Sequence, residues 1–333
     1  MRILVTGAAG FIGSATASAL AKAGLQVLAV DNFSPYYSTD LKELRREVLL
    51  DSPQIEFRKV DLSDPETTNQ LFEQEDFSSI IHLAAQAGVR VPIENWKKYT
   101  SDNLQGFSNI LISAANKGVK NFIYASSSSI YGNSTSHRFT ESGLVPAPVS
   151  FYGATKLANE ILASSTSLVT GMKTRGLRFF TVYGPWGRPD MVYFRMVTSA
   201  ITQEPFDFFG NGQVERDFTY ISDVVAMILE LESELSSRGE GFSDVVNIGG
   251  GQPRSINQIL ELIEGIAKVK IPFRRQQANQ SDVQRTSADF TYLNSLINTY
   301  PTVKAENGLE EFFVWANQPR VREQLSTWVR SVN

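Results

Sequence analysis

Short apolar runs alternate with longer amphipathic stretches along the first half of the chain. Six runs rich in β-branched residues predict strands, and these runs are Arg2–Thr6, Gln26–Asp31, Ile55–Asp61, Ser79–Ala84, Asn121–Ser126 and Leu177–Val182. The stretches between them predict helices at Ile12–Lys22, Tyr37–Leu49, Asp64–Gln74, Thr100–Lys117 and Tyr152–Leu168. This alternation is typical of a parallel sheet that is covered by helices on both faces. We therefore predict an α/β fold with a doubly wound parallel sheet.

The pattern changes after about Tyr183, where proline, glycine and aromatic residues become frequent. Three later elements are predicted, namely helices at Met191–Gln203 and Val224–Leu235 and a strand at Val245–Ile248 that returns to the sheet. We expect a first domain over residues 1–177, with a return segment near 220–250. Residues 178–333 are expected to form a smaller C-terminal α/β lobe that binds the substrate.

The charge balance argues against a nucleic acid as partner. The 333 residues include 31 Lys+Arg and 35 Asp+Glu, which gives a formal net charge of −4. Binding to the phosphates of a nucleic acid usually requires a basic excess or a basic stripe, and the sequence has neither. No apolar run reaches the ~18 residues of a membrane span. We expect a soluble, cytoplasmic protein that binds neither nucleic acid nor membrane.

Cysteine and histidine usage excludes several kinds of catalytic chemistry. The sequence has no cysteine, which excludes disulfides, thiolate metal sites and a cysteine nucleophile. The two histidines, His82 and His137, have no partner at the spacing of metal ligands. We therefore expect two structural histidines and no metal site.

A glycine-rich segment follows the first predicted strand and opens the first helix. It runs Val5-Thr6-Gly7-Ala8-Ala9-Gly10-Phe11-Ile12-Gly13. Glycine permits a tight turn and a close approach of the backbone to a pyrophosphate, which the positive end of the helix attracts. Asp31 ends the second strand, where a carboxylate accepts hydrogen bonds from an adenosine ribose and repels a 2′-phosphate. Both features predict a Rossmann-type site for NAD rather than NADP.

Tyr152 and Lys156 lie about one helical turn apart at the start of a predicted helix. The lysine charge favours ionisation of the phenol, and a phenol of lowered pKa can accept a hydroxyl proton while hydride leaves the same carbon. The run Ser126-Ser127-Ser128-Ser129 follows the fifth strand, so it lies at the same end of the sheet. A hydroxyl there is placed to polarise a substrate oxygen.

Together these segments resemble the extended short-chain dehydrogenase/reductase family, in particular its nucleotide-sugar epimerases and dehydratases. The resemblance covers nearly the whole chain, and its motifs are Thr6–Gly13, Asp31-Asn32, Asp61-Leu62, Leu83-Ala84-Ala85, Asn103, the serine run, Tyr152, Lys156 and Asn247-Ile248-Gly249. It implies that NAD is bound by Gly7, Gly10, Phe11, Ile12, Gly13, Asp31, Asn32, Asp61, Leu62, Leu83, Ala84, Ala85, Asn103, Tyr152 and Lys156. The catalytic residues that it implies are Ser127, Tyr152 and Lys156. It also implies a homodimer formed through the helices at Thr100–Lys117 and Tyr152–Leu168.

Within this family the sequence is most similar to the UDP-glucuronate 4-epimerases. The stretches that carry the similarity are Ala84–Arg90, Arg178–Met191 and Arg216–Tyr220. One departure is Ser281-Asp282-Val283, where the family commonly has Gly-Asp-Val, and the tail from Asn317 onward matches loosely. The resemblance implies that a UDP-sugar substrate contacts Arg90, Ser127, Ser128, Tyr152, Thr181, Arg188, Arg216, Asp282 and Arg285.

These relatives all begin by moving a hydride from the sugar C4 to NAD, and they differ in the next step. Family dehydratases carry an Asp-Glu pair where this chain has Ser128 and Ser129, and decarboxylases tend to carry a glutamate at the second position. Hydroxyls cannot do that acid–base work. The sequence therefore predicts 4-epimerisation of UDP-glucuronate to UDP-galacturonate through a transient 4-keto sugar. Arg188 is expected to hold the sugar carboxylate, which would otherwise leave the β-keto acid as carbon dioxide.

Four alternatives remain from the sequence alone. The enzyme alternatives are a 4-epimerase of the UDP-glucose/UDP-galactose type, for which Arg188 has no carboxylate to hold, and a UDP-glucuronate decarboxylase. A cofactor-sensing protein without activity would not need Ser127, Tyr152 and Lys156. A scaffold that acts through its helices would need none of the predicted site.

Overall fold

The computed structural model describes residues 2–89, 92–134, 136–142, 146–277 and 283–332. Within these ranges, a parallel sheet of seven strands has the order β10-β6-β5-β4-β1-β2-β3. The strands are β1 (Arg2–Thr6), β2 (Val27–Asp31), β3 (Ile55–Lys59), β4 (Phe77–His82), β5 (Asn121–Ser127), β6 (Lys173–Phe179) and β10 (Ser243–Ile248). The order reverses at β1, which pairs with β2 on one side and β4 on the other. Such a switch point opens a crevice at the carboxyl ends of the strands.

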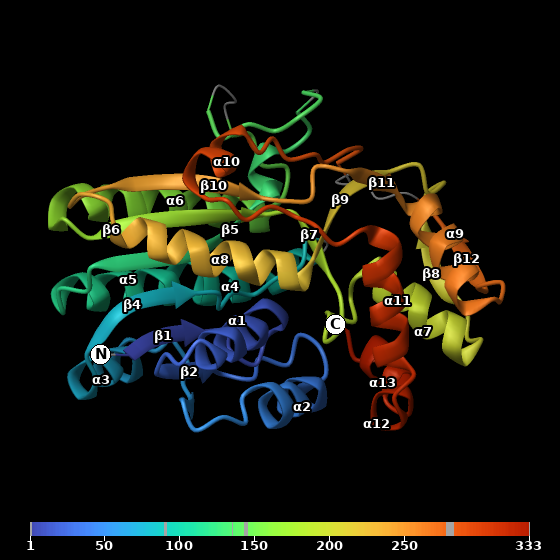
Figure 1. The fold of residues 1–333 in the computed structure, drawn as a ribbon, viewed down its shortest axis with the longest axis horizontal. Coiled ribbons are helices and arrows are strands. Elements are labelled where there is room, and N and C mark those ends of the chain that lie inside the picture. Colours follow the sequence, from blue (N-terminus) through green and yellow to red (C-terminus); the bar gives the residue numbers. More distant parts are fainter. Residues whose placement is uncertain (1, 90–91, 135, 143–145, 278–282, 333) are drawn as a thin grey trace.

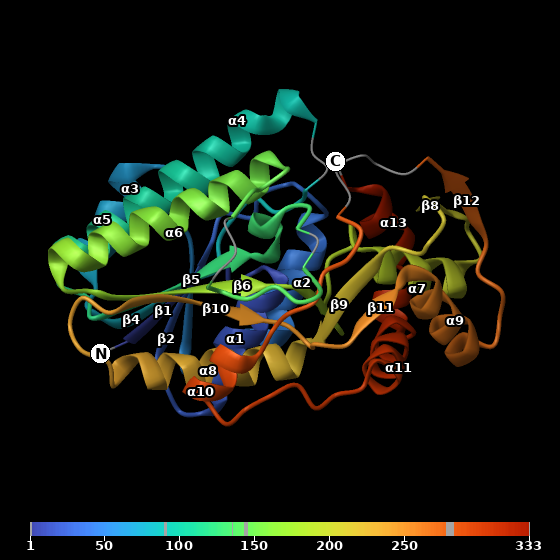
Figure 2. The same ribbon diagram turned by 90° about the horizontal axis from the view of Figure 1, so that it is seen from above.

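Helices cover both faces of the sheet (Figure 2). On one face lie α3 (Pro65–Gln74), α4 (Trp96–Tyr99), α5 (Gly106–Asn116) and α6 (Phe151–Thr170), and on the other lie α1 (Phe11–Lys22), α2 (Thr39–Leu49) and α8 (Ile221–Ser236). Polar caps set several of their ends: Asp64 caps α3, Ser150 caps α6, and Gly171 ends α6 with a left-handed φ of 76°. No helix in the described ranges is long and apolar enough to cross a membrane.

The second half of the chain adds a smaller lobe beyond the carboxyl ends of the strands (Figure 1). Its elements are β7 (Thr181–Tyr183), α7 (Val192–Thr202), β8 (Phe206–Phe209), β9 (Glu215–Tyr220), β11 (Pro253–Ser255), α9 (Ile256–Ala267), β12 (Phe273–Gln276), α11 (Ala305–Ala316), α12 (Pro319–Arg322) and α13 (Leu325–Arg330). Helix α10 (Thr291–Leu296) also belongs to this half of the chain, but it lies beside β10 of the large sheet. Strand β9 pairs with β7 and β11, while β8 pairs with β12. The predicted doubly wound parallel sheet is confirmed, and β10 is the predicted strand that returns to it.

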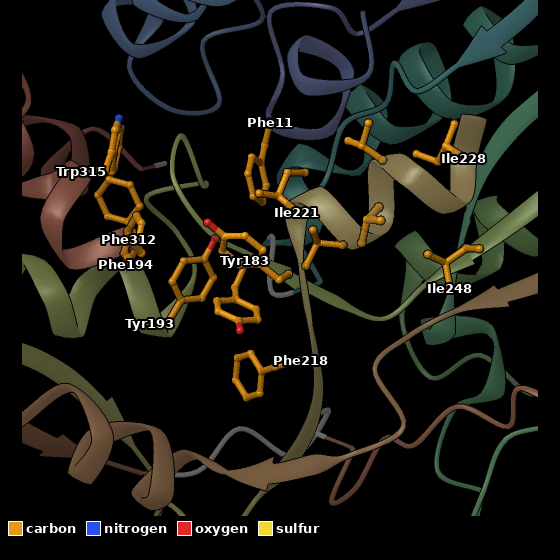
Figure 3. Packing of buried hydrophobic residues seen from close by; sticks show 14 of the residues in the cluster. Phe11, Tyr183, Tyr193, Phe194, Phe218, Ile221, Ile228, Ile248, Phe312 and Trp315 are labelled. Atoms are coloured by element: carbon orange, nitrogen blue, oxygen red, sulfur yellow. The ribbon is translucent and has the colours of Figure 1, made fainter. Parts of the chain in front are cut away.

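One hydrophobic cluster continues from the sheet into the second lobe (Figure 3). Ile228 and Ile248 lie on the sheet side of this cluster, and Tyr183, Tyr193 and Trp315 lie on the lobe side. All five side chains are at most 5% exposed. Because both parts of the chain bury apolar surface in the same cluster, the lobe is fixed against the carboxyl edge of the sheet.

Strand β6 begins at Lys173, four residues before the apolar run that predicted it. Its first residues are polar, yet Arg175 is fully buried. The Arg175 guanidinium pairs with Asp244 at 2.8 Å and Glu234 at 2.5 Å. The strand therefore starts with a buried ion pair, which an apolar pattern cannot reveal.

The predicted helix at Thr100–Lys117 is interrupted by a wider turn. A 3-10 segment at Ile93–Asn95 leads into α4, and Thr100–Gln105 forms a π-helix before α5 begins at Gly106. The π-helix contains Asn103, which is buried. Wider turns of this kind re-aim a side chain and often occur near functional sites.

Candidate active site

A cavity of about 760 Å³ opens at the carboxyl edge of the sheet. The loops that follow β1, β2, β3, β4 and β5 line one side, and residues of α7, β8 and β9 line the other. Its volume is within the ~300–1,000 Å³ that small-molecule sites usually have. The cavity therefore lies where the reversal of strand order predicts a crevice.

Glycines in the first loop allow backbone segments to touch at the base of this cavity. Gly7 has a φ of 66°, and a Cβ there would lie 2.7 Å from the backbone nitrogen of Ala84. A Cβ on Gly13 would lie 2.1 Å from the carbonyl oxygen of Gly7. No side chain caps the start of α1, whose N-cap is Gly10. The loop thus presents backbone N–H groups at the positive end of a helix.

Two carboxylates lie at the ends of neighbouring strands on the same side of the cavity. Asp31 is 8% exposed and accepts hydrogen bonds from the backbone N–H groups of Ala9 at 3.1 Å and Phe33 at 2.8 Å. Burial acts to raise the pKa of Asp61, but hydrogen bonds from the hydroxyl and amide of Ser63 hold that pKa below its usual value. Each carboxylate oxygen can accept more than one hydrogen bond, so Asp31 also has capacity for a ligand.

Ser127, Tyr152 and Lys156 come together at the end of β5. The Ser127 hydroxyl is hydrogen-bonded to the Tyr152 phenol and lies 3.1 Å from the Ser129 hydroxyl. The Lys156 ammonium donates to the carbonyl oxygen of Ala125 at 2.9 Å and lies 5.9 Å from the centre of the Tyr152 ring. All three side chains line the cavity. The structure thus brings the predicted trio together, while its catalytic role remains a prediction.

The electrostatic environment of the phenol differs from the expectation. Burial raises the pKa of Tyr152, whereas the positive charge of Arg188 and the hydrogen bond from Ser127 act to lower it. Burial also lowers the pKa of Lys156 to about 8. The expectation that the lysine charge lowers the pKa of the phenol is therefore wrong for this structure, because desolvation dominates and the nearby effective cation is Arg188.

Arg188 lies in the loop after β7 and forms a bidentate ion pair. Its Nε and Nη2 donate to the two oxygens of Asp190 at 3.0 and 2.5 Å. The Tyr36 hydroxyl donates to the same carboxylate at 3.4 Å. Burial acts to lower the pKa of Arg188, but Asp190 raises it above its usual value. A guanidinium has five N–H donors, so Asp190 uses one edge and a second anion can use the other.

Most of the predicted site residues line this cavity. They are Gly7, Gly10, Phe11, Ile12, Gly13, Asp31, Asn32, Asp61, Leu62, Leu83, Ala84, Ala85, Ser127, Ser128, Tyr152, Lys156, Thr181, Arg188 and Arg216. Arg90 and Asp282 lie outside the described residues.

Two predicted residues are placed elsewhere. Asn103 does not line the cavity: its side-chain oxygen accepts from Gln86 N at 2.8 Å, and its amide donates to Gln86 O at 3.1 Å and Thr155 Oγ1 at 3.2 Å. Asn103 thus holds the loop after β4 against α6, and its contact with NAD stays a prediction. The Arg285 guanidinium pairs with Glu215 at 3.1 Å, its side chain is 45% exposed, and the residue does not line the cavity, so its substrate contact stays a prediction.

Several residues in the cavity wall were not predicted from the sequence. These are Tyr36, Lys42, Asp190 and Arg195. Lys42 is 7% exposed and donates to the carbonyl oxygen of Ser34 at 2.7 Å. Its position soon after the carboxyl end of β2 could have indicated that Lys42 lines the cavity. A lysine in a charged helical stretch, however, is usually exposed to solvent.

Comparisons with known proteins agree with this geometry. Residues 3–249 match the model of the NAD dependent epimerase/dehydratase family. The chain belongs to this family. It is 37% identical to "Protein CapI" of Staphylococcus aureus, over 95% of this chain and 98% of the relative. It is 38% identical to "Probable UDP-glucuronate 4-epimerase" of Rhizobium meliloti, over 96% of this chain and 97% of the relative.

A solved structure gives the same result for the fold of this epimerase/dehydratase-family chain. The UDP-glucuronic acid 4-epimerase from Bacillus cereus, in complex with UDP-glucuronic acid and NAD, superposes with a TM-score of 0.87. The two proteins are 32% identical, and the match covers 95% of this chain and 98% of the other.

The residues at the base of the cavity fit the family's cofactor, NAD. Close backbone packing at Gly7 and Gly13 and the uncapped start of α1 suit an anionic pyrophosphate. The Asp31 carboxylate suits a ribose whose hydroxyls are both unmodified. We expect these groups to hold the cofactor, with Asp61 beside the adenine.

His82 has a structural place beneath the cofactor loop. Its Nδ1 lies 2.9 Å from Thr6 Oγ1, which accepts a hydrogen bond from Ala84 N at 3.1 Å. Burial and the charge of Lys156 lower the pKa of His82 to about 3. The imidazole is therefore neutral at pH 7, and it shares a hydrogen bond with the Thr6 hydroxyl whose direction depends on the tautomer. In the described part of the chain, no three side chains of metal-ligand type form a cluster.

The low pKa of His82 predicts that its imidazole does not gain a proton in the neutral pH range. Between a folded-state pKa of about 3 and the ordinary 6.5, the unfolded chain binds more protons, so the free energy of unfolding falls as the pH drops through this window. We expect the His82 ring signals in NMR spectra to stay unchanged from about pH 8 to about pH 5. His137→Gln identifies which signals belong to His82, and a midpoint near pH 6.5 for those signals would contradict the prediction.

Proposed function

We propose that this protein catalyses NAD-dependent 4-epimerisation of UDP-glucuronate to UDP-galacturonate through a transient 4-keto sugar. The observation that carries the proposal is that one cavity contains the hydrogen-bonded Ser127 and Tyr152 hydroxyls and also the Arg188 guanidinium. The first two groups suit oxidation of a sugar hydroxyl, and the third suits a carboxylate. Relatives named as UDP-glucuronate 4-epimerases support this substrate.

The side chains of the trio divide the work of proton transfer. NAD, which Gly7, Gly13 and Asp31 would hold, would supply the hydride acceptor for C4 and then the hydride donor for the opposite face of the ketone. Tyr152 takes the C4 hydroxyl proton as the hydride leaves and gives it back when the hydride returns. Ser127 lies beside the phenol, so its hydroxyl can turn to donate to the same sugar oxygen. The positive charge of Arg188 stabilises the phenolate that forms, while Lys156 is held beside the phenol by the Ala125 carbonyl.

The wall beside the trio supports hydride return without further chemistry. A 4-keto glucuronate is a β-keto acid, which loses carbon dioxide when its carboxylate turns out of the plane of the ketone. A second bidentate contact on Arg188 would hold that carboxylate in place. Ser128 and Ser129 line the cavity with hydroxyls at the positions where other reaction types need acidic side chains. These contacts favour an epimerase over a dehydratase or a decarboxylase.

We further propose which parts of the molecule bind each ligand. Residues 1–177, together with the returning strand β10, form the NAD-binding part, and residues 178–333 supply the nucleotide-sugar contacts. Arg216 and Thr181 line the lobe side of the cavity and are proposed to contact the UDP-sugar. A cytoplasmic location is expected for an enzyme of a nucleotide-sugar substrate.

A homodimer is proposed from an apolar surface on α5 and α6. Ile112 on α5 is 56% exposed, and Ile161, Leu168 and Val169 on α6 are 63%, 76% and 83% exposed. The two helices contact each other on one face of the sheet. Several exposed apolar side chains on two neighbouring helices are typical of a protein–protein interface.

Product analysis tests the proposed reaction. We expect purified protein incubated with UDP-glucuronate to form UDP-galacturonate, and Tyr152→Phe to lose activity by about 10²-fold or more, since the proton acceptor is gone. Tyr300→Phe is the matched control, because Tyr300 is 63% exposed and does not line the cavity. A UDP-pentose or a 4-keto sugar as the sole product would overturn the proposal.

Arg188 is expected to select the acidic sugar. Arg188→Ala should weaken UDP-glucuronate binding roughly 30-fold or more, because a charged group loses its partner. Binding of UDP-glucose should change by less than about 3-fold. Calorimetric titration with both ligands measures this, and Arg320→Ala on the exposed α12 is the control. Equal losses for the two sugars would show that Arg188 does not read the carboxylate.

The apolar surface on α5 and α6 predicts the mass of the protein in solution. We expect twice the chain mass of 37.0 kDa. Ile161→Asp should shift the protein toward the monomer, because it places a charge in the proposed interface. Val314→Asp changes an equally exposed side chain on α11 and should leave the mass unchanged. Light scattering that gives a monomer for the unmodified protein would rule out the dimer.

A further inference from the structure

A buried guanidinium joins two loops that belong to different walls of the cavity. Arg45, on α2, is fully buried. Its Nη1 donates to the carbonyl oxygen of Ala9 at 3.1 Å and to the Tyr37 hydroxyl at 2.6 Å. Its Nε and Nη2 donate to the carbonyl oxygen of Trp186 at 3.0 and 2.7 Å, and Nη2 also donates to that of Gly187 at 2.9 Å.

The partners of Arg45 are unusual for a buried cation. Arg175 and Arg178, two deeply buried arginines of β6, pair with Asp244 and Glu160. Arg45 instead donates to three carbonyl oxygens and a phenol, and no carboxylate of the described residues is in ion-pair distance of it. Removing a charge from water without an opposite charge is costly. Only a planar fork of donors reaches all these acceptors at once, which explains an arginine here.

On one side Arg45 fixes the cofactor loop. Ala9 lies between Gly7 and Gly10, and its N–H donates to Asp31 at 3.1 Å while its carbonyl accepts from Arg45. Both ends of this residue are therefore held, so the orientation of the peptide that leads into α1 is set. That peptide is part of the surface expected to face the NAD pyrophosphate.

On the other side Arg45 fixes the loop that carries Arg188. Trp186 has a φ of 67°, which is unfavourable for a residue with a Cβ. Its indole packs against Trp315, with ring centres 5.3 Å apart. The hydrogen bonds from Arg45 to the Trp186 and Gly187 carbonyls hold this conformation immediately before Arg188.

We propose that Arg45 is a positioning residue that locks the Arg188 loop onto the cofactor loop and thereby sets the preference for a sugar carboxylate. The inference rests on the proposed role of Arg188 in substrate selection. Arg45 is not exposed to the cavity, so it acts through the loop rather than on the substrate. Geometry rather than charge is the requirement, because a lysine at this position keeps the cation but cannot span both loops.

The test compares Arg45→Lys with Arg46→Lys, the same change one position further along the helix. Arg46 is 43% exposed and pairs with Glu43, so it is a matched control. We expect Arg45→Lys to weaken UDP-glucuronate binding roughly tenfold in calorimetric titration, since the Arg188 loop is no longer held, and to change UDP-glucose binding by less than about 3-fold. Arg46→Lys should leave both affinities unchanged.

A double variant separates positioning from general support of the fold. In the Arg188→Ala background, Arg45→Lys should cause no further loss of preference between the two sugars, because it acts through Arg188. A further loss of preference, or equal losses for both sugars in the single variant, would overturn the proposal. If Arg45→Lys does not fold, Tyr37→Phe removes one acceptor of the same guanidinium and should shift the preference in the same direction by a smaller factor.

The experiment also distinguishes this inference from the proposed reaction. If the unmodified protein prefers UDP-glucuronate over UDP-glucose in binding but forms no UDP-galacturonate, the reaction is wrong and the role of Arg45 is still decided by the change in preference. If epimerisation occurs and Arg45→Lys leaves the preference intact, the inference about Arg45 fails alone.

Discussion

Contact between two backbones at the carboxyl edge of the sheet is the constraint on which the site depends. Gly7 lies so close to Leu83 and Ala84 that a Cβ would fall within 3 Å of their main-chain atoms. The Thr6 hydroxyl ties the same two loops together through Ala84 N and the neutral His82 ring. With the loops after β1 and β4 in contact, α1 starts at the base of the cavity and its N-terminus faces inward. Every other functional group is placed relative to this floor.

The parts of this arrangement that depend on local sequence could be predicted. The apolar runs located six strands of the sheet and the returning strand, because buried parallel strands need continuous apolar side chains. Single segments also predicted the glycine-rich loop, the carboxylate of Asp31 and the pair Tyr152/Lys156, because the residue types themselves indicate the chemistry. Their meeting in one cavity also followed, since the carboxyl ends of parallel strands share an edge.

Features that depend on contacts between distant segments could not be predicted. Arg45 is followed by Arg46 in a charged helical stretch, and nothing local shows that one is fully buried while the other is 43% exposed. Asn103 matches a family motif, but the sequence does not show that it lies in a π-helix. In that helix its side chain bonds to the backbone of Gln86 and does not line the cavity. The direction of the pKa shift of Tyr152 likewise required the structure, because burial of the phenol outweighs the Arg188 charge and the Ser127 hydrogen bond. Arg188 and Asp190 are only two positions apart, but the sequence does not show that their side chains form a bidentate ion pair.

Arginines in the cavity wall explain how a protein with a negative net charge can bind a negatively charged substrate. The net charge of −4 is the sum over all 333 residues, whereas Arg188 and Arg216 place positive charge in the wall of the cavity. Local charge rather than net charge decides what such a cleft attracts. In the proposed mechanism the hydride leaves and returns to the same carbon within this one cavity. Epimerisation of UDP-glucuronate deuterated at C4, followed by NMR of the product, tests it most directly: full retention of deuterium at C4 is the predicted result, and loss of that label to the solvent would contradict the account.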